Sequence, residues 1–253
     1  VIHSGSRGVG KQIAEFFMRQ AAVEDTDKER YEKEFELKNT WRSVNPEKWE
    51  NLKNEFCLKR TKSRIGGDFE GHYGFDLNSK WGQIYLNDMN QALQFALDNR
   101  KTMIDEIVNC IKGVFKTQNV QTSRFINRNH NHAEVVDGQY VIHRKGATHA
   151  EDGMLGVIPG NMRDGSFIVM GKGNNESLCS SSHGAGRILS RRAAKEQLNI
   201  DEFHKSMEGI VTNHNNGTID EAPNAYKNIF DVMKQQEELV QVIDRITPVL
   251  NIK

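Results

Sequence analysis

The stretch Cys179–Arg187 reads CSSSHGAGR and places one histidine, His183, between a run of serines and a Gly-Ala-Gly turn. Small residues let a ligand approach the backbone closely, and glycines free amide N–H groups to face phosphate oxygens. An alanine-rich helical pattern begins at Arg187, and a helix start adds positive potential there. The stretch therefore predicts a phosphate-binding loop with an imidazole in reach of the phosphate. The alternative is a tight turn before a helix, with a surface histidine.

Two more places combine histidine with polar neighbours. His3 lies beside serine, glycine and Arg7 after a predicted strand end, a position where ligands and metals are commonly held. His130 and His132 are two residues apart, so in an extended segment both imidazoles project to one face, and Glu134 can supply a hydrogen bond to a ligating ring. This spacing indicates a metal site, although a histidine met alone is more often structural.

A basic loop containing a glycine is predicted at Arg144–Ala150, directly after the alternating segment Tyr140–His143, which is typical of a strand. Guanidinium and ammonium groups beside a glycine suit an anion. A solvated loop is the alternative interpretation.

The N-terminal glycines do not predict a dinucleotide-binding fold. Gly5, Gly8 and Gly10 lack the required intervals, and no acidic ribose partner follows a second strand. The sequence also opens in the middle of a motif, without an initiator methionine, which indicates a fragment of a longer chain.

The overall composition excludes some classes of protein. Lys+Arg and Asp+Glu both number 34, so any binding of nucleic acid must come from a local patch. The three cysteines, Cys57, Cys110 and Cys179, form no close pair, which disfavours a disulfide framework and suits a reducing compartment. No apolar run approaches the ~20 residues of a membrane span, and the first residues are not a signal peptide. We therefore expect a cytoplasmic protein without a membrane partner.

Helical and strand patterns are mixed without regular β-α alternation, which favours an α+β fold over a doubly wound sheet. A long helix is predicted at about 83–116, and its polar residues Asn99 and Arg100 either point at a site or cap a neighbour. A highly charged, peripheral excursion is predicted at about 24–72. The other expected elements are strands at Val1–Ile2, Leu155–Ile158, Ser166–Gly171 and Ile246–Ile252, and helices at Lys28–Lys38, Pro46–Leu58, 187–197 and about 220–245.

Six motifs occur in one order along the chain. They are HSGSRG at 3–8, NHN at 129–131, HRKGAT at 143–148, PGNM at 159–162, SSHGAGR at 181–187 and DEAPNAYK at 220–227. Together they resemble the RtcB-type RNA ligases, enzymes of tRNA splicing and RNA repair that join an RNA 3′-phosphate or 2′,3′-cyclic phosphate end to a 5′-hydroxyl end. The resemblance implies that residues 1–253 are the C-terminal part of a single catalytic domain, with mixed sheets around a central metal and nucleotide site and helices outside.

The resemblance also implies a guanylyltransferase mechanism. The histidine that matches His183 attacks the α-phosphorus of GTP and forms a covalent GMP adduct, a step for which neutral imidazole is a competent nucleophile. GMP then passes to the RNA 3′-phosphate, and the 5′-hydroxyl displaces it. The family uses two Mn²⁺ ions, and His3 and His130 match two of their histidine ligands. The implied partners are RNA ends, those of tRNA among them, and an archease-like activator.

Other positions match family residues that bind nucleotide or RNA. Arg7 and Arg187 match arginines placed to hold phosphate or RNA ends, for which a bidentate guanidinium is suited. The positions that match nucleotide-contacting residues are His130, Asn131, Pro159, Gly160, Asn161, Met162, Ser166, His183, Gly184, Ala185, Gly186 and Lys253, the last of which matches the lysine that reads the guanine.

The sequence also departs from the family pattern. Asn161 stands where the family usually has serine, Arg163 where it has glycine, and His149 where it has arginine. The family's Asp-Val-Gly-Cys-Gly and Asn-His-Phe segments are absent from this sequence, and with them an aspartate, a bridging cysteine and one histidine ligand of the metals. We therefore expect a ligase whose missing segment lies in the rest of the natural protein or in another chain. The alternative is a catalytically incomplete, ligase-like module that binds RNA ends or a partner.

Overall fold

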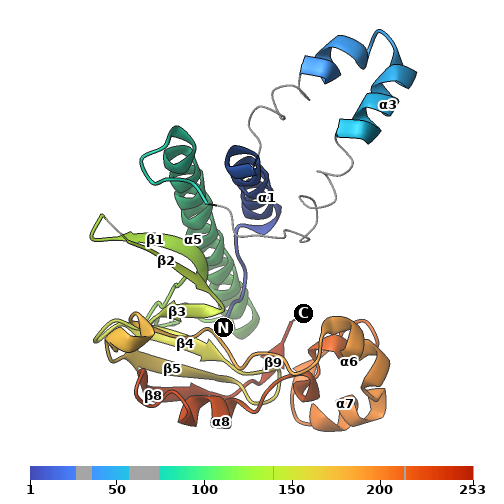
Figure 1. Ribbon diagram of the computed structural model, residues 1–253. Helices are drawn as coiled ribbons and strands as arrows, with labels where there is room; N and C mark the ends of the chain where they lie inside the picture. The colour runs from blue at the N-terminus through green and yellow to red at the C-terminus, as the bar shows by residue number, and fades with distance from the viewer. Residues whose placement is uncertain (27–35, 57–73, 139, 214, 253) are drawn as a thin grey trace. The chain divides into compact units, whose positions relative to one another are not determined.

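The computed structural model describes residues 1–26, 36–56, 74–138, 140–213 and 215–252 (Figure 1). Helices occur together with several small sheets, which confirms the predicted α+β class. The chain divides into two compact units, one formed by Ser6–Ala96 and the other by Val1–Gly5 together with the chain from Leu97 onward. Each unit is described by itself below.

The unit Ser6–Ala96 contains α1 (Arg7–Thr26), α3 (Pro46–Phe56) and the first part of α5 (Lys80–Phe115). Phe17 of α1 is 3% exposed and packs against aromatic rings on both sides of the start of α5, with its centroid 5.2 Å from that of Tyr85 and 6.2 Å from that of Phe75. The helix predicted at Pro46–Leu58 is confirmed by α3 over the described residues. Most of the helix predicted at Lys28–Lys38 lies outside the described residues, as does Cys57.

The long helix predicted at 83–116 is confirmed by α5, but its apolar stripe is buried only in the first half. Met89, Ala92 and Ala96 are buried at helical spacing. Farther along, Met103 and Ile107 are 38% and 44% exposed. The apolar periodicity therefore locates the helix correctly and overstates the length of its buried face.

The second unit contains the strands, all of which occur in small sheets. A hairpin joins β1 (Asn131–Val136) to β2 (Tyr140–Lys145), and β3 (Ala147–His149) pairs antiparallel with β6 (Ser180–Ser182). The largest sheet has the antiparallel order β4 (Leu155–Pro159), β5 (Ser166–Gly171), β8 (Val240–Ile246), and β7 (Val211–Thr212) runs parallel to β9 (Leu250–Asn251). The helical elements of this unit are the rest of α5, α6 (Arg191–Gln197), α7 (Ile200–Ser206), α8 (Ile229–Lys234) and the short 3-10 helices Asn175–Ser177, Ile219–Glu221 and Pro223–Ala225.

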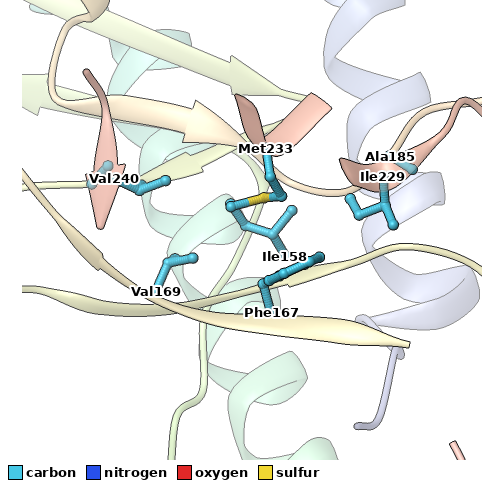
Figure 2. Packing of buried hydrophobic residues seen from close by; sticks show 8 residues of the cluster. Ile158, Phe167, Val169, Ala185, Ile229, Met233 and Val240 are labelled. Carbon is cyan, nitrogen blue, oxygen red and sulfur yellow. The ribbon is translucent and has the colours of Figure 1, made fainter. Parts of the chain in front are cut away.

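Two apolar clusters hold the second unit together. In the first, side chains of β4, β5 and β8 pack against α8 (Figure 2), and its buried members are Ala150, Ile158, Phe167, Val169, Ala185, Ile229, Met233 and Val240. In the second, Met162 packs with residues of α7 and the following segments, namely Phe203, Met207, Ile219 and Ala222. Ala185 joins the first cluster two residues after His183, so the core fixes the loop that carries this histidine.

The single helix predicted at about 220–245 is wrong. The residue before a proline is pushed out of the helical region, and Ala222 before Pro223 has ψ 147°. The chain forms two 3-10 turns there, and Asn228 then caps α8 by accepting a hydrogen bond from the amide of Phe230 at 3.0 Å. The residues after α8 form β8, which pairs with β5.

Three other boundaries also differ from the predictions. The helix expected from residue 187 begins at Arg191, because the Ser190 side chain caps it through the amide of Ala193. The strand expected at Ile246–Ile252 is reduced to β9, since Pro248 cannot donate to a strand ladder. Val1–Ile2 form no strand, and Val1 is 71% exposed.

Replacement of Ile158 by alanine tests the first cluster. Ile158 is fully buried, so Ile158→Ala should lower the free energy of unfolding by about 2–5 kcal/mol, through lost transfer energy and a residual cavity. The control Val249→Ala changes a side chain that is 77% exposed and should alter stability by less than about 0.5 kcal/mol. Denaturant unfolding followed by circular dichroism measures both, and equal effects of the two substitutions would contradict this packing.

Candidate active site

Three histidines that are far apart in the sequence lie together in the second unit. The Nε2 atoms of His3 and His130 are 2.9 Å apart, and their rings meet edge to face with centroids 5.0 Å apart. The centroid of the His130 ring is 4.7 Å from that of His183. This imidazole cluster (His3, His130 and His183) thus joins the predicted nucleophile to both predicted metal ligands.

Arg100 of α5 connects two of the segments that carry these histidines. Its guanidinium donates to the Ser4 carbonyl at 2.9 Å, next to His3. It also donates to the side-chain oxygens of Asn127 at 2.6 Å and Asn129 at 2.8 Å, the latter next to His130. Arg100 therefore caps neighbouring segments, as one of the two interpretations expected, and these segments carry His3 and His130.

Two neighbours support the loop that carries His183: the backbone of Gly146 and the buried side chain of Gln236. The His183 amide donates to the Gly146 carbonyl at 3.3 Å, and a Cβ at Gly146 would lie 3.4 Å from the imidazole, at a φ of +73° that favours glycine. The buried side chain of Gln236 accepts from the Ser182 amide at 3.1 Å and donates to the Ser182 hydroxyl at 2.9 Å. Sequence analysis missed Gln236 because it falls within the helix that was predicted wrongly.

Burial and neighbouring histidines keep His183 uncharged. Desolvation lowers the pKa of His183 below its usual value, and the adjacent His130 and His3 lower it further. The Nδ1 atoms of His183 and His130 are buried without a hydrogen-bond partner among the described residues. A neutral imidazole with an unpaired ring nitrogen has a lone pair available for a phosphorus atom or a metal ion.

Two predicted nucleotide-contacting loops lie side by side. The Ala185 amide donates to the Pro159 carbonyl at 3.0 Å. A Cβ at Gly184 would lie only 3.0 Å from the same carbonyl, so this position needs a small residue. Ser166, which opposes Pro159 across the β4–β5 ladder, is buried. The pairing of these segments places the GAG turn at the end of β4.

The loop after β4 is closed by its own side chains. The Asn161 side chain accepts from the amides of Arg163 at 2.9 Å and Asp164 at 2.8 Å, and donates to the Asp164 carboxylate at 2.7 Å. The Gly160 amide donates to the Gly165 carbonyl at 2.7 Å across the same loop. Asn161 and Arg163, which depart from the family pattern, therefore act in this structure on the shape of the loop. Met162 within it is a core residue.

Arg187 is held by groups of the chain itself. Its guanidinium donates to the Leu189 carbonyl at 2.9 Å, to the Tyr226 hydroxyl at 3.1 Å and to the Asp220 carbonyl, and lies 4.9 Å above the Tyr226 ring. The Tyr226 hydroxyl donates to the Glu221 carboxylate, and burial together with this bond raises the pKa of Tyr226 to about 12. Arg187 thus ties the segment after His183 to the DEAPNAYK motif.

The sequence also predicts four other site residues, Arg7, Asn131, Gly186 and Lys253. Arg7 begins α1 in the unit Ser6–Ala96, with a φ of 56°. Asn131 begins β1, next to His130. Gly186 has a φ of +75° and its carbonyl accepts from the Lys227 amide at 3.0 Å. Lys253 lies outside the described residues. The roles of these residues remain predictions.

The structure gives His130 and His132 different partners. His130 belongs to the imidazole cluster, whereas the Nε2 atom of His132 lies 3.0 Å from that of His149, and their rings stack with centroids 5.0 Å apart. Burial lowers the pKa of His132, and the charges of His149 and Arg144 lower it further. The spacing of two residues therefore does not bring both rings to one metal.

Residues 1–253 match the family described as tRNA-splicing ligase RtcB, so the chain belongs to this family. An RNA-splicing ligase RtcB1 of Escherichia coli strain ATCC 25922 is 33% identical over 261 residues, which cover 100% of this chain and 55% of that protein. A tRNA-splicing ligase RtcB of Pyrococcus abyssi is 27% identical over 281 residues, which cover 98% of this chain and 27% of that protein.

The chain thus spans about half the length of the Escherichia coli relatives that it matches, with a coverage of 55%. None of the helices in the described part of the chain is both long enough and apolar enough to cross a membrane.

The bridging role of Arg100 can be tested by substitution. Arg100→Ala removes the donors that hold Ser4, Asn127 and Asn129, so it should lower the free energy of unfolding by about 1–3 kcal/mol because partly buried acceptors lose a charged partner. The adjacent Lys101→Ala removes only an exposed pair with Asp105 and should cost less than about 0.5 kcal/mol. Chemical denaturation of both variants measures the difference, and an Arg100→Ala protein as stable as Lys101→Ala would contradict the bridge.

Proposed function

We propose that this chain forms part of a GTP-dependent RNA ligase that joins 3′-phosphate or 2′,3′-cyclic phosphate ends to 5′-hydroxyl ends through a covalent histidine–GMP intermediate. His183 is the nucleophile. The observation that carries the proposal is the position of this half-buried imidazole, with a lowered pKa, beside the His130 ring and at the start of a glycine-rich turn. Membership of the RtcB family supports the reaction class.

His183 performs the first step as an uncharged nucleophile. A ring nitrogen attacks the α-phosphorus of GTP, a nitrogen–phosphorus bond forms, and pyrophosphate leaves. Glycines at 184 and 186 follow His183, and small residues there let phosphate oxygens approach the backbone. The RNA 3′-phosphate then takes GMP from the histidine. Attack of the 5′-hydroxyl on the activated phosphate finally releases GMP and seals the strand.

His3 and His130 are the residues of this chain that would hold manganese. Their Nε2 atoms already face each other at 2.9 Å, and the Nδ1 atom of His130 is buried without a partner among the described residues, so the pair fits a metal ion. Imidazole is an accepted ligand for this class of ion. Bound there, Mn²⁺ supplies positive charge beside the phosphate that His183 attacks. The remaining ligands would come from segments that this sequence lacks.

A hollow of about 400 Å³ offers a place for the guanosine part of the nucleotide. It lies between the loop after β4 and the DEAPNAYK motif, and is lined by Asn161, Tyr226 and Lys227 among others. The Lys227 amide donates to the carbonyl of Gly186, three residues after His183. Its size suits a small ligand. We therefore propose that the guanine base binds in this hollow and that Lys253 recognises it.

The proposed substrates are RNA ends, those of tRNA among them. Arg7 and Arg187 are proposed to hold phosphates at these ends, and an archease-like activator is a proposed partner. The charge balance of the chain requires that RNA binding come from such local groups. We place the reaction in the cytoplasm, since the three cysteines suit a reducing compartment.

Transfer of radioactive label from GTP tests the nucleophile. The natural full-length protein, incubated with [α-³²P]GTP and Mn²⁺, should gain a covalent label, and His183→Ala should abolish it because no other group replaces the ring nitrogen. The control His143→Ala removes an exposed histidine of β2 and should leave labelling unchanged. Denaturing gel electrophoresis detects the label.

The same assay separates this function from the alternative module without catalysis. If the full-length protein binds RNA with a 3′-phosphate end but gains no label, the ligase function is excluded and the binding module remains. Label that persists in His183→Ala would instead exclude His183 as the nucleophile.

A further inference from the structure

A second group of metal-binding side chains lies outside the imidazole cluster. One ring nitrogen each of His132 and His149 and a carboxylate oxygen of Glu134 all lie within 4.8 Å of one another. His132 and Glu134 are two residues apart on β1, so they project to one face of the hairpin, and His149 comes from β3. Two separate sheets therefore contribute ligand atoms to one place.

The spacing of these atoms suits a small ion bound by three ligands. The Nε2 atoms of His132 and His149 are 3.0 Å apart, and the Nε2 atom of His149 is 3.9 Å from a Glu134 oxygen. Ligand atoms about 2.0–2.2 Å from a tetrahedral zinc ion lie about 3.3–3.6 Å from one another, which falls between these two separations. Small side-chain adjustments would bring all three atoms to bonding distance.

Glu151 orients the His149 ring for metal binding. The Nδ1 atom of His149 lies 2.7 Å from a Glu151 carboxylate oxygen. Because an ionised carboxylate only accepts hydrogen bonds, Nδ1 must carry the proton, and the lone pair is then on Nε2, which faces His132. A histidine that binds a metal commonly donates its other ring N–H to a carboxylate in this way.

The local charge also favours a cation. Arg144 is 3% exposed and pairs with Glu134 at 2.5 Å, while its distance to Glu151 is 3.8 Å. Two carboxylates thus face one guanidinium, so the acidic groups outnumber the basic one here. A purely structural network of ion pairs is the competing explanation. It accounts for Arg144, but it does not require two imidazole nitrogens to face each other beside a carboxylate.

We propose that His132, Glu134 and His149 form a binding site for a divalent ion of the zinc class, separate from the site of His3, His130 and His183. Two imidazoles and one carboxylate are a ligand set typical of zinc, with a fourth position left for water. The ion would join the β1–β2 hairpin to the β3–β6 pair. The site depends on His149, which stands where the resemblance to RtcB-type ligases leads us to expect arginine.

Zinc titration of the metal-free, natural full-length protein tests the site. Calorimetry and elemental analysis should show one equivalent of Zn²⁺ that is lost in His132→Gln and in His149→Gln. The control His143→Gln changes the next histidine of the hairpin, which opposes Ala133 and therefore faces away from His132, and should retain the equivalent. The His3→Ala variant should also retain it, because that residue belongs to the other cluster.

A milder variant distinguishes loss of a zinc ligand from loss of the fold. Glu151→Gln keeps every proposed ligand but weakens the orientation of His149, so it should reduce zinc affinity by about 10- to 100-fold. Cobalt substitution adds a readout of geometry, since tetrahedral Co²⁺ absorbs strongly in the visible region and this band should disappear in His149→Gln. Equal zinc stoichiometry and affinity in wild type, His149→Gln and Glu151→Gln would overturn the proposal, whether or not GMP transfer occurs.

Discussion

The packing of three imidazoles is the constraint on which the rest of the site depends. The centroid of the His130 ring lies 5.0 Å from that of His3 and 4.7 Å from that of His183, so positive charges on neighbouring rings would repel one another. Two unit charges about 5 Å apart repel by about 3 kcal/mol at an effective dielectric constant of about 20. Burial adds to this cost and lowers the pKa of His183. An uncharged His183 ring with an available lone pair is the result, and nucleophilic attack requires it.

Three separate structural devices hold these rings in place. Arg100 links the segment of His3 to that of His130 through Ser4 and Asn129. The β3–β6 pairing sets the register of the serines before His183. The bond from Ala185 to Pro159 anchors the turn after it on the core. None of these three contacts uses an imidazole nitrogen, and the Nδ1 atoms of His130 and His183 have no hydrogen-bond partner among the described residues.

The sequence predicted the elements with a clear period and the site residues with a recognisable motif. The helical spacing of α5 and the alternation of β2 were sufficient to locate these elements, and the predicted His183, His3 and His130 lie together. The single helix predicted at about 220–245 was wrong, because its run of helix-forming residues is interrupted by Pro223 and by the capping residue Asn228. The neighbourhood of His149 could not be predicted, since the β1–β3 arrangement that brings it to His132 is tertiary.

The central claim is that folding keeps His183 neutral through burial and through its two histidine neighbours. NMR titration of the imidazole nitrogens of His183, in metal-free full-length protein, measures this directly. The account predicts a pKa below the ordinary value of 6.5, and a rise toward it in the His3→Ala/His130→Ala variant. Because the unfolded chain then binds the proton more readily, stability should fall as the pH drops through this range. A pKa at or above 6.5 in the folded protein would contradict the account.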